Sequence, residues 1–459
     1  MSKKLSSVFV CQSCGFESPK WAGQCVCGAW NSFVEEKPAP PVENGARRLA
    51  ATGIGDRSEP VRLGEVRSDA YERLDTGLSE LNRVLGGGIV LGSATLISGE
   101  PGIGKSTIIT EAAANIADRY GKVLYISGEE SEEQIKLRAD RVCGKLPKEL
   151  YLLSETNIER ILDAAEKLAP VFLIVDSIQT LYSSALESAP GSVSQVRVCA
   201  NALLRYGKSD AVPIFIVAHV TKAGDLAGPR IIEHLVDCVL QFAGERDQDM
   251  RVLRSNKNRF GATNEIGAFE MAESGLIPID NLSQSFLEGM AGAAEGAVAT
   301  AVYEGSRPLL LELQALTAPA NAGFARRSAL GVEAARLNMI LAVLERRSGL
   351  SLIDRDVYVN VVGGLKPEGT SMDLAVALAI YSSCRSVPIG TKTIVIGEIS
   401  LTGDLRTVRH AERIVREAAR LGFERVILPK KNADRIGEPV PGLRVSGVND
   451  LSAAITTLQ

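Results

Sequence analysis

The stretch "ATLISGEPGIGKST", residues 94 to 107, decides the fold of this chain. An apolar run leads into a glycine-rich loop, and apolar and small residues at helical spacing follow. The G-x-x-x-x-G-K-[ST] spacing suits phosphate chemistry, because glycines let backbone N–H groups surround the phosphates while Lys105 reaches the outer ones and Ser106 holds magnesium. The predicted nucleotide-binding residues of this strand, loop and helix are Gly99, Glu100, Pro101, Gly102, Ile103, Gly104, Lys105, Ser106 and Thr107.

Three further apolar runs end in residues that suit nucleotide chemistry. "PVFLIVDSIQTL" places Asp176 at the carboxyl end of a buried strand, where a carboxylate orients magnesium. "KVLYISGEES" ends in Glu129 and Glu130, and a carboxylate there polarises the attacking water. We favour Glu129 and keep Glu130 open, and a carboxylate at a helix start is the simpler alternative. His219 ends "VPIFIVAH" and either senses the γ-phosphate or has a structural role.

Strands alternate with helices through this region, and each of these residues follows a strand. That order predicts an α/β fold with a mostly parallel sheet covered on both faces. The carboxyl ends of parallel strands share one edge of the sheet, so the sequence predicts the core of a motor-type ATPase.

"RSNKNRFG", residues 254 to 261, places Lys257 and Arg259 two positions apart in a probable strand. Alternate side chains of a strand share a face, so both cations point the same way. If the later strands run away from the nucleotide, these cations reach the γ-phosphate of a neighbouring copy instead of their own. Such cations, supplied in trans, stabilise the charge of phosphoryl transfer. A solvated strand edge is the alternative.

The first residues include "CQSCGFESPKWAGQCVCGAW", in which Cys11, Cys14, Cys25 and Cys27 are the predicted ligands of one zinc ion. Four thiolates satisfy tetrahedral zinc in a segment too short to bury a core of its own. A pair of disulfides is the alternative, and a reducing compartment disfavours it. The second pair is C-x-C, one residue shorter than the usual C-x-x-C, so the second knuckle must be tight. The other four cysteines read as buried thiols.

Composition limits the class of protein. The 459 residues support about three domains at about 150 residues each. A net charge of -4 means that nucleic-acid binding depends on local patches rather than on the whole molecule. The apolar runs are far shorter than the roughly 20 residues of a membrane helix, and the start lacks a cleavable leader. We expect a cytoplasmic protein with no membrane partner.

Beyond these patterns, the chain resembles the bacterial RadA (Sms) family of DNA repair proteins over nearly its whole length. The resemblance rests on "DTGLSELNRVLGGGIVLGSATLISGEPGIGKST", "ISGEES", "LIVDSIQTL", "HVTKAGDLAGPRIIEHLVD" and "KNRFG", in this order behind a four-cysteine front. The phosphate loop alone is generic, whereas "KNRFG" together with the cysteine module is specific. The shortened "CVC" departs from the family's usual C-x-x-C.

The resemblance implies a RecA-like ATPase related to hexameric DnaB-type helicases, with ATP, Mg²⁺ and Zn²⁺ as cofactors. Its implied activity is DNA-stimulated: it processes recombination intermediates and promotes branch migration beside the RecA recombinase. Implied partners are single-stranded and branched DNA, RecA, and further copies of the chain in a ring. Lys105 and Ser106 become the Walker-A pair and Asp176 the Walker-B carboxylate. The implied motor motif is Lys257, Asn258, Arg259, Phe260 and Gly261.

The C-terminal part is similar to the α+β proteolytic domain of Lon, which uses a Ser-Lys pair. Ser371 stands where the nucleophile is expected, but Glu412 occupies the place of the lysine. A carboxylate cannot replace the amine as base, so we read Ser371 as a hydroxyl at a helix start and the domain as a scaffold. An ATP-dependent peptidase or a nucleotide-switched protein scaffold remains the alternative function.

The predicted domains are a zinc finger at 1–34, a Pro- and Ala-rich linker at 35–65, the ATPase at 66–284 and the Lon-like domain at 285–459. Within the last, the pairs Arg326–Arg327 and Arg346–Arg347 are candidate phosphate contacts. Paired arginines also occur on solvated helix faces, and both readings stay open.

Overall fold

A computed structural model of the chain describes residues 8–11, 16–36, 72–219, 229–244, 250–263, 265–290, 292–320, 325–363, 367, 369–437 and 440–458. The chain divides into two compact units, Met1–Asp280 and Asn281–Gln459. The predicted boundary between residues 284 and 285 falls inside helix α8 (Leu282–Leu287), which packs on strand β16 of the second unit. No helix in the described part of the chain is both long and apolar enough to cross a bilayer.

The N-terminal module is a small antiparallel ribbon. Strand β1 (Val8–Cys11) lies between β2 (Glu17–Ser18) and β3 (Phe33–Glu36). Its buried hydrophobic cluster consists of Cys11, Cys25 and Phe33, with Phe16 against Phe33 edge to face. So small an apolar cluster gives little stability, which is why a metal is needed to hold such a module together.

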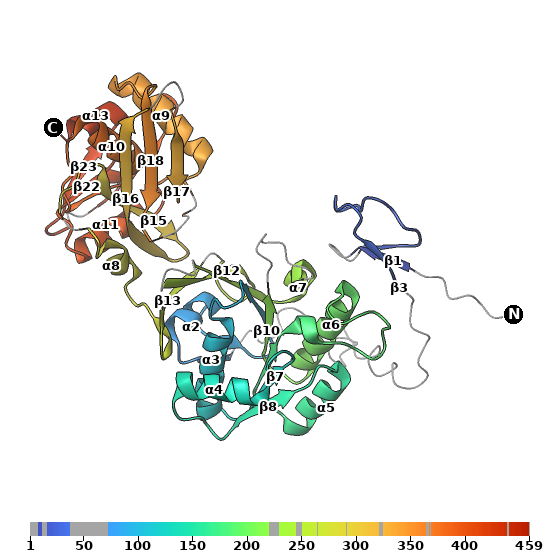
Figure 1. Cartoon of the computed structure of the whole chain (residues 1–459). Coiled ribbons are helices and arrows are strands. Elements are labelled where there is room, and N and C mark those ends of the chain that lie inside the picture. Colours follow the sequence, from blue (N-terminus) through green and yellow to red (C-terminus); the bar gives the residue numbers. More distant parts are fainter. Residues whose placement is uncertain are drawn as a thin grey trace, which may run out of the picture. The chain divides into compact units, whose positions relative to one another are not determined.

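The ATPase is built on one twisted sheet whose described strands follow the order β14-β13-β12-β11-β6-β10-β9-β7-β8 (Figure 1). Strands from β11 to β8 run parallel, and β12, β13 and β14 extend the sheet antiparallel. Their bounds are β6 Ala94–Gly99, β7 Val123–Ser127, β8 Leu150–Ser154, β9 Phe172–Asp176, β10 Ile214–His219, β11 Cys238–Ala243, β12 Met250–Asn258, β13 Ile266–Ala272 and β14 Gly275–Pro278. The short pair β4 (Arg73–Leu74) and β5 (Ile89–Val90) stands apart.

Helices cover both faces of this sheet because its central strands are apolar on both sides. Ile97 packs in the core beneath α2 (Ser79–Leu85), α3 (Lys105–Arg119) and α4 (Glu132–Cys143), whereas Leu96 packs in the core beneath α5 (Ile158–Leu168), α6 (Val193–Ser209) and α7 (Pro229–Leu235). Side-chain oxygens cap the N-termini of several helices. Ser131 and Gln134 form a capping box on α4, and Asn157 and Ser192 cap α5 and α6.

The second unit is an α+β domain with a mixed sheet of described strands in the order β17-β18-β16-β15-β19-β22-β23. Helices α9 and α10 belong to it, and α11 packs on β15 and β16. The strands are β15 Ala297–Glu304, β16 Arg307–Pro319, β17 Arg327–Leu330, β18 Arg355–Val361, β19 Thr393–Val395, β22 Arg425–Pro429 and β23 Arg444–Val448, with β20 Glu398–Ile399 and β21 Leu405–Arg406 as a separate pair. The helices are α9 Ala334–Ser348, α10 Asp373–Arg385, α11 Ala411–Arg420, α12 Lys430–Ala433 and α13 Leu451–Thr456.

The predicted fold class is confirmed. The chain has an α/β P-loop core with the RecA-like arrangement of a largely parallel, two-sided sheet. A ribbon precedes this core and an α+β domain follows it.

The ATPase core depends on the aromatic pair Phe172 and Phe215 of the neighbouring strands β9 and β10. Their ring centroids lie 5.0 Å apart, edge to face, and both side chains are fully buried. Phe215→Ala should therefore lower the free energy of unfolding by about 3–5 kcal/mol, measured from the urea midpoint. Leu137→Ala, at an exposed position on α4, is the matched control and should change it by less than about 0.5 kcal/mol. Equal effects of the two substitutions would contradict this core assignment.

Candidate active site and metal-binding ribbon

The phosphate loop joins the end of β6 to the start of α3. Gly102 and Gly104 have φ values of 80° and 112°, which side-chain-bearing residues rarely adopt. A Cβ on Gly104 would also lie 3.0 Å from Leu276 and from Met271. Glycine is thus required both for the turn and for close packing, and the loop leads directly into the first turn of a helix, where anions are favoured.

Lys105 is almost wholly buried at the head of α3. Its Nζ donates to the carbonyl oxygens of Gly99 (2.8 Å) and Glu100 (2.9 Å), so the amine is held by the loop itself. Burial lowers the pKa of Lys105 to about 8, although the carboxylates of Asp176 and Glu129 oppose the shift. The ammonium therefore sits beside both acidic residues that the sequence selected.

Asp176 lies at the carboxyl end of β9, next to the end of β7. Its Oδ2 accepts hydrogen bonds from the Ser106 hydroxyl and from the Tyr125 hydroxyl, each at 2.7 Å. Burial and the adjacent Asp176 charge raise the pKa of Tyr125 well above its usual value, so Tyr125 stays a donor. Adjacent hydroxyl and carboxylate oxygens are the donors that Mg²⁺ prefers, and Ser106 and Asp176 fit that ion.

The two glutamates after β7 have different neighbours. The Glu130 carboxylate forms an ion pair with Arg138 of α4. The Glu129 carboxylate accepts a hydrogen bond from the Ser177 hydroxyl, which follows Asp176, and its charge reaches Lys105. This geometry favours Glu129 over Glu130 as the residue that faces the nucleotide. His219 ends β10 opposite Gly99 of β6, and its side chain lies outside the described part of the structure.

The cations of the "KNRFG" motif lie at the other end of the sheet. Val239 of β11 pairs with Leu96 near the start of β6 and with Lys257 of β12. The phosphate loop leaves β6 at its far end, after Gly99. Three residues of strand separate these levels by about 10 Å, and two interstrand spacings of about 4.8 Å add to that. Lys257 and Arg259 are therefore directed away from the phosphate loop of their own chain.

The remaining motif residues fasten this segment to the core. Asn258 Nδ2 donates to the Val84 carbonyl oxygen (3.2 Å), and its Oδ1 accepts from Phe260 N–H (2.9 Å). Arg73 Nη2 donates to the Phe260 carbonyl oxygen (2.9 Å). Gly261 packs so closely on Gly86 that a Cβ on Gly86 would lie 3.0 Å from the Gly261 Cα. The motif thus has an anchored backbone at the end of α2.

Within the described part of the chain, the two cations contact residues close by in α7 and just after it. Lys257 Nζ donates to the carbonyl oxygens of Glu233 (2.7 Å) and His234 (3.3 Å) in the last turn of α7. Arg259 Nη1 lies 3.3 Å from an oxygen of Asp237, and its side chain is 56% exposed. Burial and the nearby Arg259 lower the pKa of Lys257. Both side chains are placed where an incoming anion can replace these contacts.

Several residues at these sites were not anticipated from the sequence. Tyr125 donates a hydrogen bond to Asp176, and Ser177 donates one to Glu129. Arg138 forms an ion pair with Glu130 and so distinguishes the two glutamates. Arg73 and Gly86 hold the motif from positions far away in the chain. The one available signal was the glycine run at 86–88, which is longer than the single glycine that commonly ends a helix.

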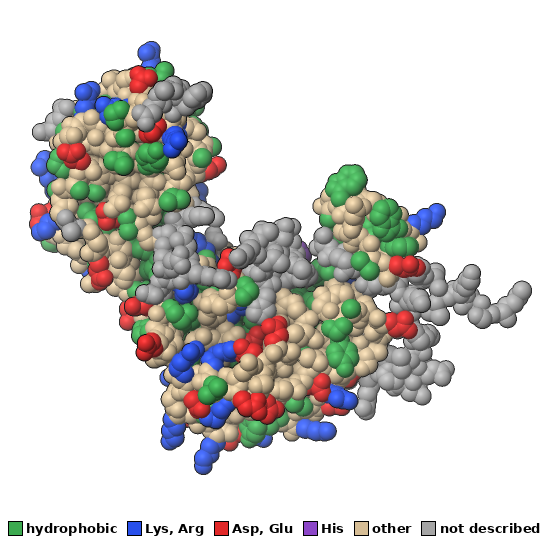
Figure 2. Space-filling model, viewed as in Figure 1, with side chains coloured by type: hydrophobic (Ala, Val, Ile, Leu, Met, Phe, Trp, Pro, Cys, Tyr) green, Lys and Arg blue, Asp and Glu red, His purple; other side chains and the backbone are tan. Residues whose placement is uncertain are grey.

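The ribbon brings three thiols together. The sulfurs of Cys11, Cys25 and Cys27 all lie within 4.8 Å of one another, and those of Cys11 and Cys27 are 3.9 Å apart. Tetrahedral zinc with Zn–S bonds of about 2.3 Å needs sulfurs about 3.8 Å apart, so the cluster fits zinc, including the short C-x-C pair. Cys14 lies outside the described residues. Trp21 and Trp30 of this module are exposed. Hydrophobic side chains show on the surface of the module in Figure 2.

The C-terminal domain does not assemble a Ser-Lys pair among its described residues. Ser371 Oγ donates to the Ala301 carbonyl oxygen at 3.3 Å, and Glu412 pairs with Arg416 on the surface of α11. The serine thus has a structural partner instead of a base. Arg346 and Arg347 lie in the last turn of α9, where cations favour the helix dipole.

Three family models match parts of the chain. Residues 9–35 match the rubredoxin metal binding domain, residues 58–225 match the AAA domain, and residues 329–432 match subunit ChlI of Mg-chelatase. The first match covers all four N-terminal cysteines and the second covers the phosphate loop and Asp176. The chain is accordingly an ATP hydrolase that uses ATP and Mg²⁺, with a zinc-binding ribbon in front.

Curated relatives match over the full length. The DNA repair protein RadA of Bacillus subtilis (strain 168) is 48% identical over 459 residues, which cover 99% of each chain. RadA of Halalkalibacterium halodurans is 47% identical over 99% of each chain, and RadA of Streptococcus pyogenes serotype M1 is 47% identical over 100% of each. Identity at this level across the ribbon, the ATPase and the C-terminal domain places the chain in the RadA family of DNA repair proteins.

Proposed function

We propose that this protein is a DNA-dependent ATPase that processes recombination intermediates and promotes branch migration of RecA-mediated strand exchange. Its partners are single-stranded and branched DNA, the RecA recombinase, and further copies of itself in a hexameric ring. Relatives of similar length are named DNA repair proteins, which supports the DNA substrate. The observation that carries the motor proposal is the position of Lys257 and Arg259 at the sheet end opposite their own phosphate loop.

Within one subunit, the residues at the loop edge prepare the nucleotide. Lys105 exchanges the carbonyls of Gly99 and Glu100 for phosphate oxygens. Ser106 and Asp176 hold Mg²⁺, which neutralises charge on the phosphates. Glu129, oriented by the Ser177 hydroxyl, positions the attacking water.

A second subunit completes the site. Lys257 and Arg259 project from the opposite edge, so a neighbour whose motif edge meets this phosphate loop supplies two cations to the developing charge. Asn258, Phe260 and Gly261 fix the backbone from which they project. Asn258 and Gly261 contact α2 and its C-terminal end. A shift of the cations on hydrolysis therefore moves α2 in the core of the subunit that supplies them. That linkage is the proposed route from ATP turnover to movement on DNA.

The phosphate cradle is tested by Lys105→Ala, which removes the only side chain in the loop able to neutralise the outer phosphates. ATP hydrolysis measured with single-stranded DNA should fall by about 100-fold or more. Lys208→Ala, an exposed lysine on α6, is the matched control and should retain wild-type turnover. Turnover by the Lys105 variant within about twofold of wild type would exclude the assigned role.

Catalysis in trans is tested by mixing two inactive proteins. Arg259→Ala alone should bind ATP but not hydrolyse it with DNA present, because its seams lack the cation. When it is mixed with Lys105→Ala, some contacts between subunits combine both intact parts. The Arg259→Ala subunit supplies an intact phosphate loop and the Lys105→Ala subunit supplies Arg259, so hydrolysis should return. A mixture of Arg259→Ala with the double variant Lys105→Ala/Arg259→Ala has no intact seam and is the control. If the first mixture regains no more activity than this control, Arg259 acts in cis.

The zinc ligands are tested by elemental analysis of purified protein. Cys25→Ser should lose bound zinc, because the three remaining thiolates hold the ion too weakly to survive purification. Cys384→Ser changes a cysteine outside the cluster and should keep the wild-type zinc content. ATP binding by both variants should be unchanged, since the ATPase core has its own hydrophobic clusters. Full zinc retention by Cys25→Ser would contradict the assignment.

A further inference from the structure

The C-terminal domain has a free strand edge at β17. This strand is outermost among the described strands of its sheet and pairs in parallel with β18. Val357 N–H donates to the Arg326 carbonyl oxygen at 2.8 Å, so the main chain at Arg326 faces β18. Main-chain direction alternates along a strand, and the N–H and C=O groups of Arg327 and Ala329 therefore face outward. Such an edge is a template for one more strand.

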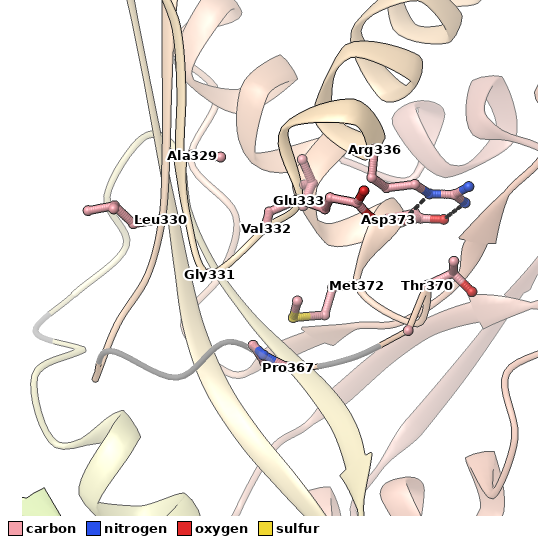
Figure 3. A pocket seen from close by; sticks show the side chains of 12 residues that line it. Ala329, Leu330, Gly331, Val332, Glu333, Arg336, Pro367, Thr370, Met372 and Asp373 are labelled. Atoms are coloured by element: carbon pink, nitrogen blue, oxygen red, sulfur yellow. Dashed lines mark hydrogen bonds and ion pairs between the residues drawn. The ribbon is translucent and has the colours of Figure 1, made fainter. Parts of the chain in front are cut away.

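A cavity of about 590 Å³ lies on the helical side of this edge. It is bounded by the end of β17, the start of α9 and the start of α10, and its wall includes Val332, Met372 and Val376 (Figure 3). Arg336 and Asp373 form a bidentate ion pair in that wall, and Asp373 also accepts from Ile399 N–H at 3.1 Å. The pair cancels its own charge, which leaves the exposed Glu333 carboxylate as the remaining charge of the lining, so the cavity suits an apolar side chain and disfavours an acidic one.

A second cavity, of about 490 Å³, lies on the opposite face of the same strand. Leu316 of β16, Tyr358 of β18 and Leu330 of β17 line it, and Leu330 also borders the first cavity. Leu316 and Leu330 are 61% and 65% exposed, which leaves apolar surface in water on both sides of the edge. Two cavities thus flank the outer edge of β17, which has no partner among the described strands.

We propose that the β17 edge binds an extended peptide segment of a partner protein. An added strand directs successive side chains to opposite faces, so neighbouring residues of the peptide enter the two cavities while its backbone pairs with Arg327 and Ala329. Exposed Arg327 and Glu333 stand at the two ends of this edge, and they select a peptide with an acidic residue at one end and a basic residue at the other.

The chemistry of the edge distinguishes this occupant from others. A nucleic acid lacks the alternating N–H and C=O groups that a strand edge pairs with, and the Glu333 carboxylate that remains beside the neutralised ion pair repels a phosphate. The site holds a peptide without cutting it, because Ser371 donates to the Ala301 carbonyl oxygen and does not line the cavity. The inference is independent of the ATPase mechanism.

The test begins with a phage-displayed library of random decapeptides selected against the full-length protein. We expect enriched sequences with apolar residues at adjacent positions between an acidic and a basic residue. The recovered peptide is then synthesised with a fluorophore and its affinity is measured by anisotropy. Methylation of its backbone nitrogens one at a time should weaken binding at alternate positions only, as strand pairing requires. No enrichment, or equal effects of methylation at every position, would overturn the proposal.

Variants of the protein locate the site. Leu330→Glu places a charge between the cavities at a position exposed enough to leave folding intact, and it should weaken the peptide at least about tenfold. Leu401→Glu, an exposed leucine of the same domain that borders neither cavity, should bind as wild type. DNA-stimulated ATP hydrolysis should be unchanged in both. Equal peptide affinity in the two variants, displacement of the peptide by single-stranded DNA, or a smaller oligomer for Leu330→Glu alone would each refute a partner peptide at this edge.

Discussion

Strand direction is the constraint on which the ATPase depends. Parallel strands deliver their carboxyl ends to one edge of the sheet, so β6, β7 and β9 bring Lys105, Glu129 and Asp176 together without any of them being close in sequence. The antiparallel strand β12 returns to the other end of the sheet, where Lys257 lies next to its last residue and Arg259 directly follows the strand. The nucleotide-binding residues and the two cations therefore lie at opposite ends of the strands of one sheet. The proposed contact between two copies, in which the cations of one copy meet the phosphate loop of the next, is the simplest way to combine them.

The parts of this site that follow from local chemistry were predictable from the sequence. Glycines with positive φ, a buried lysine and a strand-end Asp176 each belong to short stretches whose spacing reports their geometry. The choice between Glu129 and Glu130 is different in kind, because it depends on which glutamate Arg138 neutralises from the next helix. Periodicity predicts that both glutamates follow a strand. It does not predict which of the two forms an ion pair with an arginine of the next helix.

The "KNRFG" motif shows the same limit over a longer range. Its charged residues suggested a role at once, whereas Asn258, Phe260 and Gly261 had no evident task until Arg73 and Gly86 were seen beside them. These contacts join segments separated by most of the ATPase domain, so no local pattern contains them. The C-x-C spacing is the opposite case: the sequence raised doubt about zinc geometry, and the thiols of Cys25 and Cys27 nevertheless lie within reach of one ion.

The resting place of the Lys105 amine affects how products leave. A buried ammonium that lost its phosphate acceptors without replacement would have unsatisfied donors, and that cost would slow the departure of phosphate and ADP. The carbonyl oxygens of Gly99 and Glu100 lie 2.8 and 2.9 Å from Lys105 Nζ. On product release these acceptors can therefore replace the phosphate oxygens. The loop carbonyls thus lower the cost of separating the amine from phosphate oxygens, which favours product release.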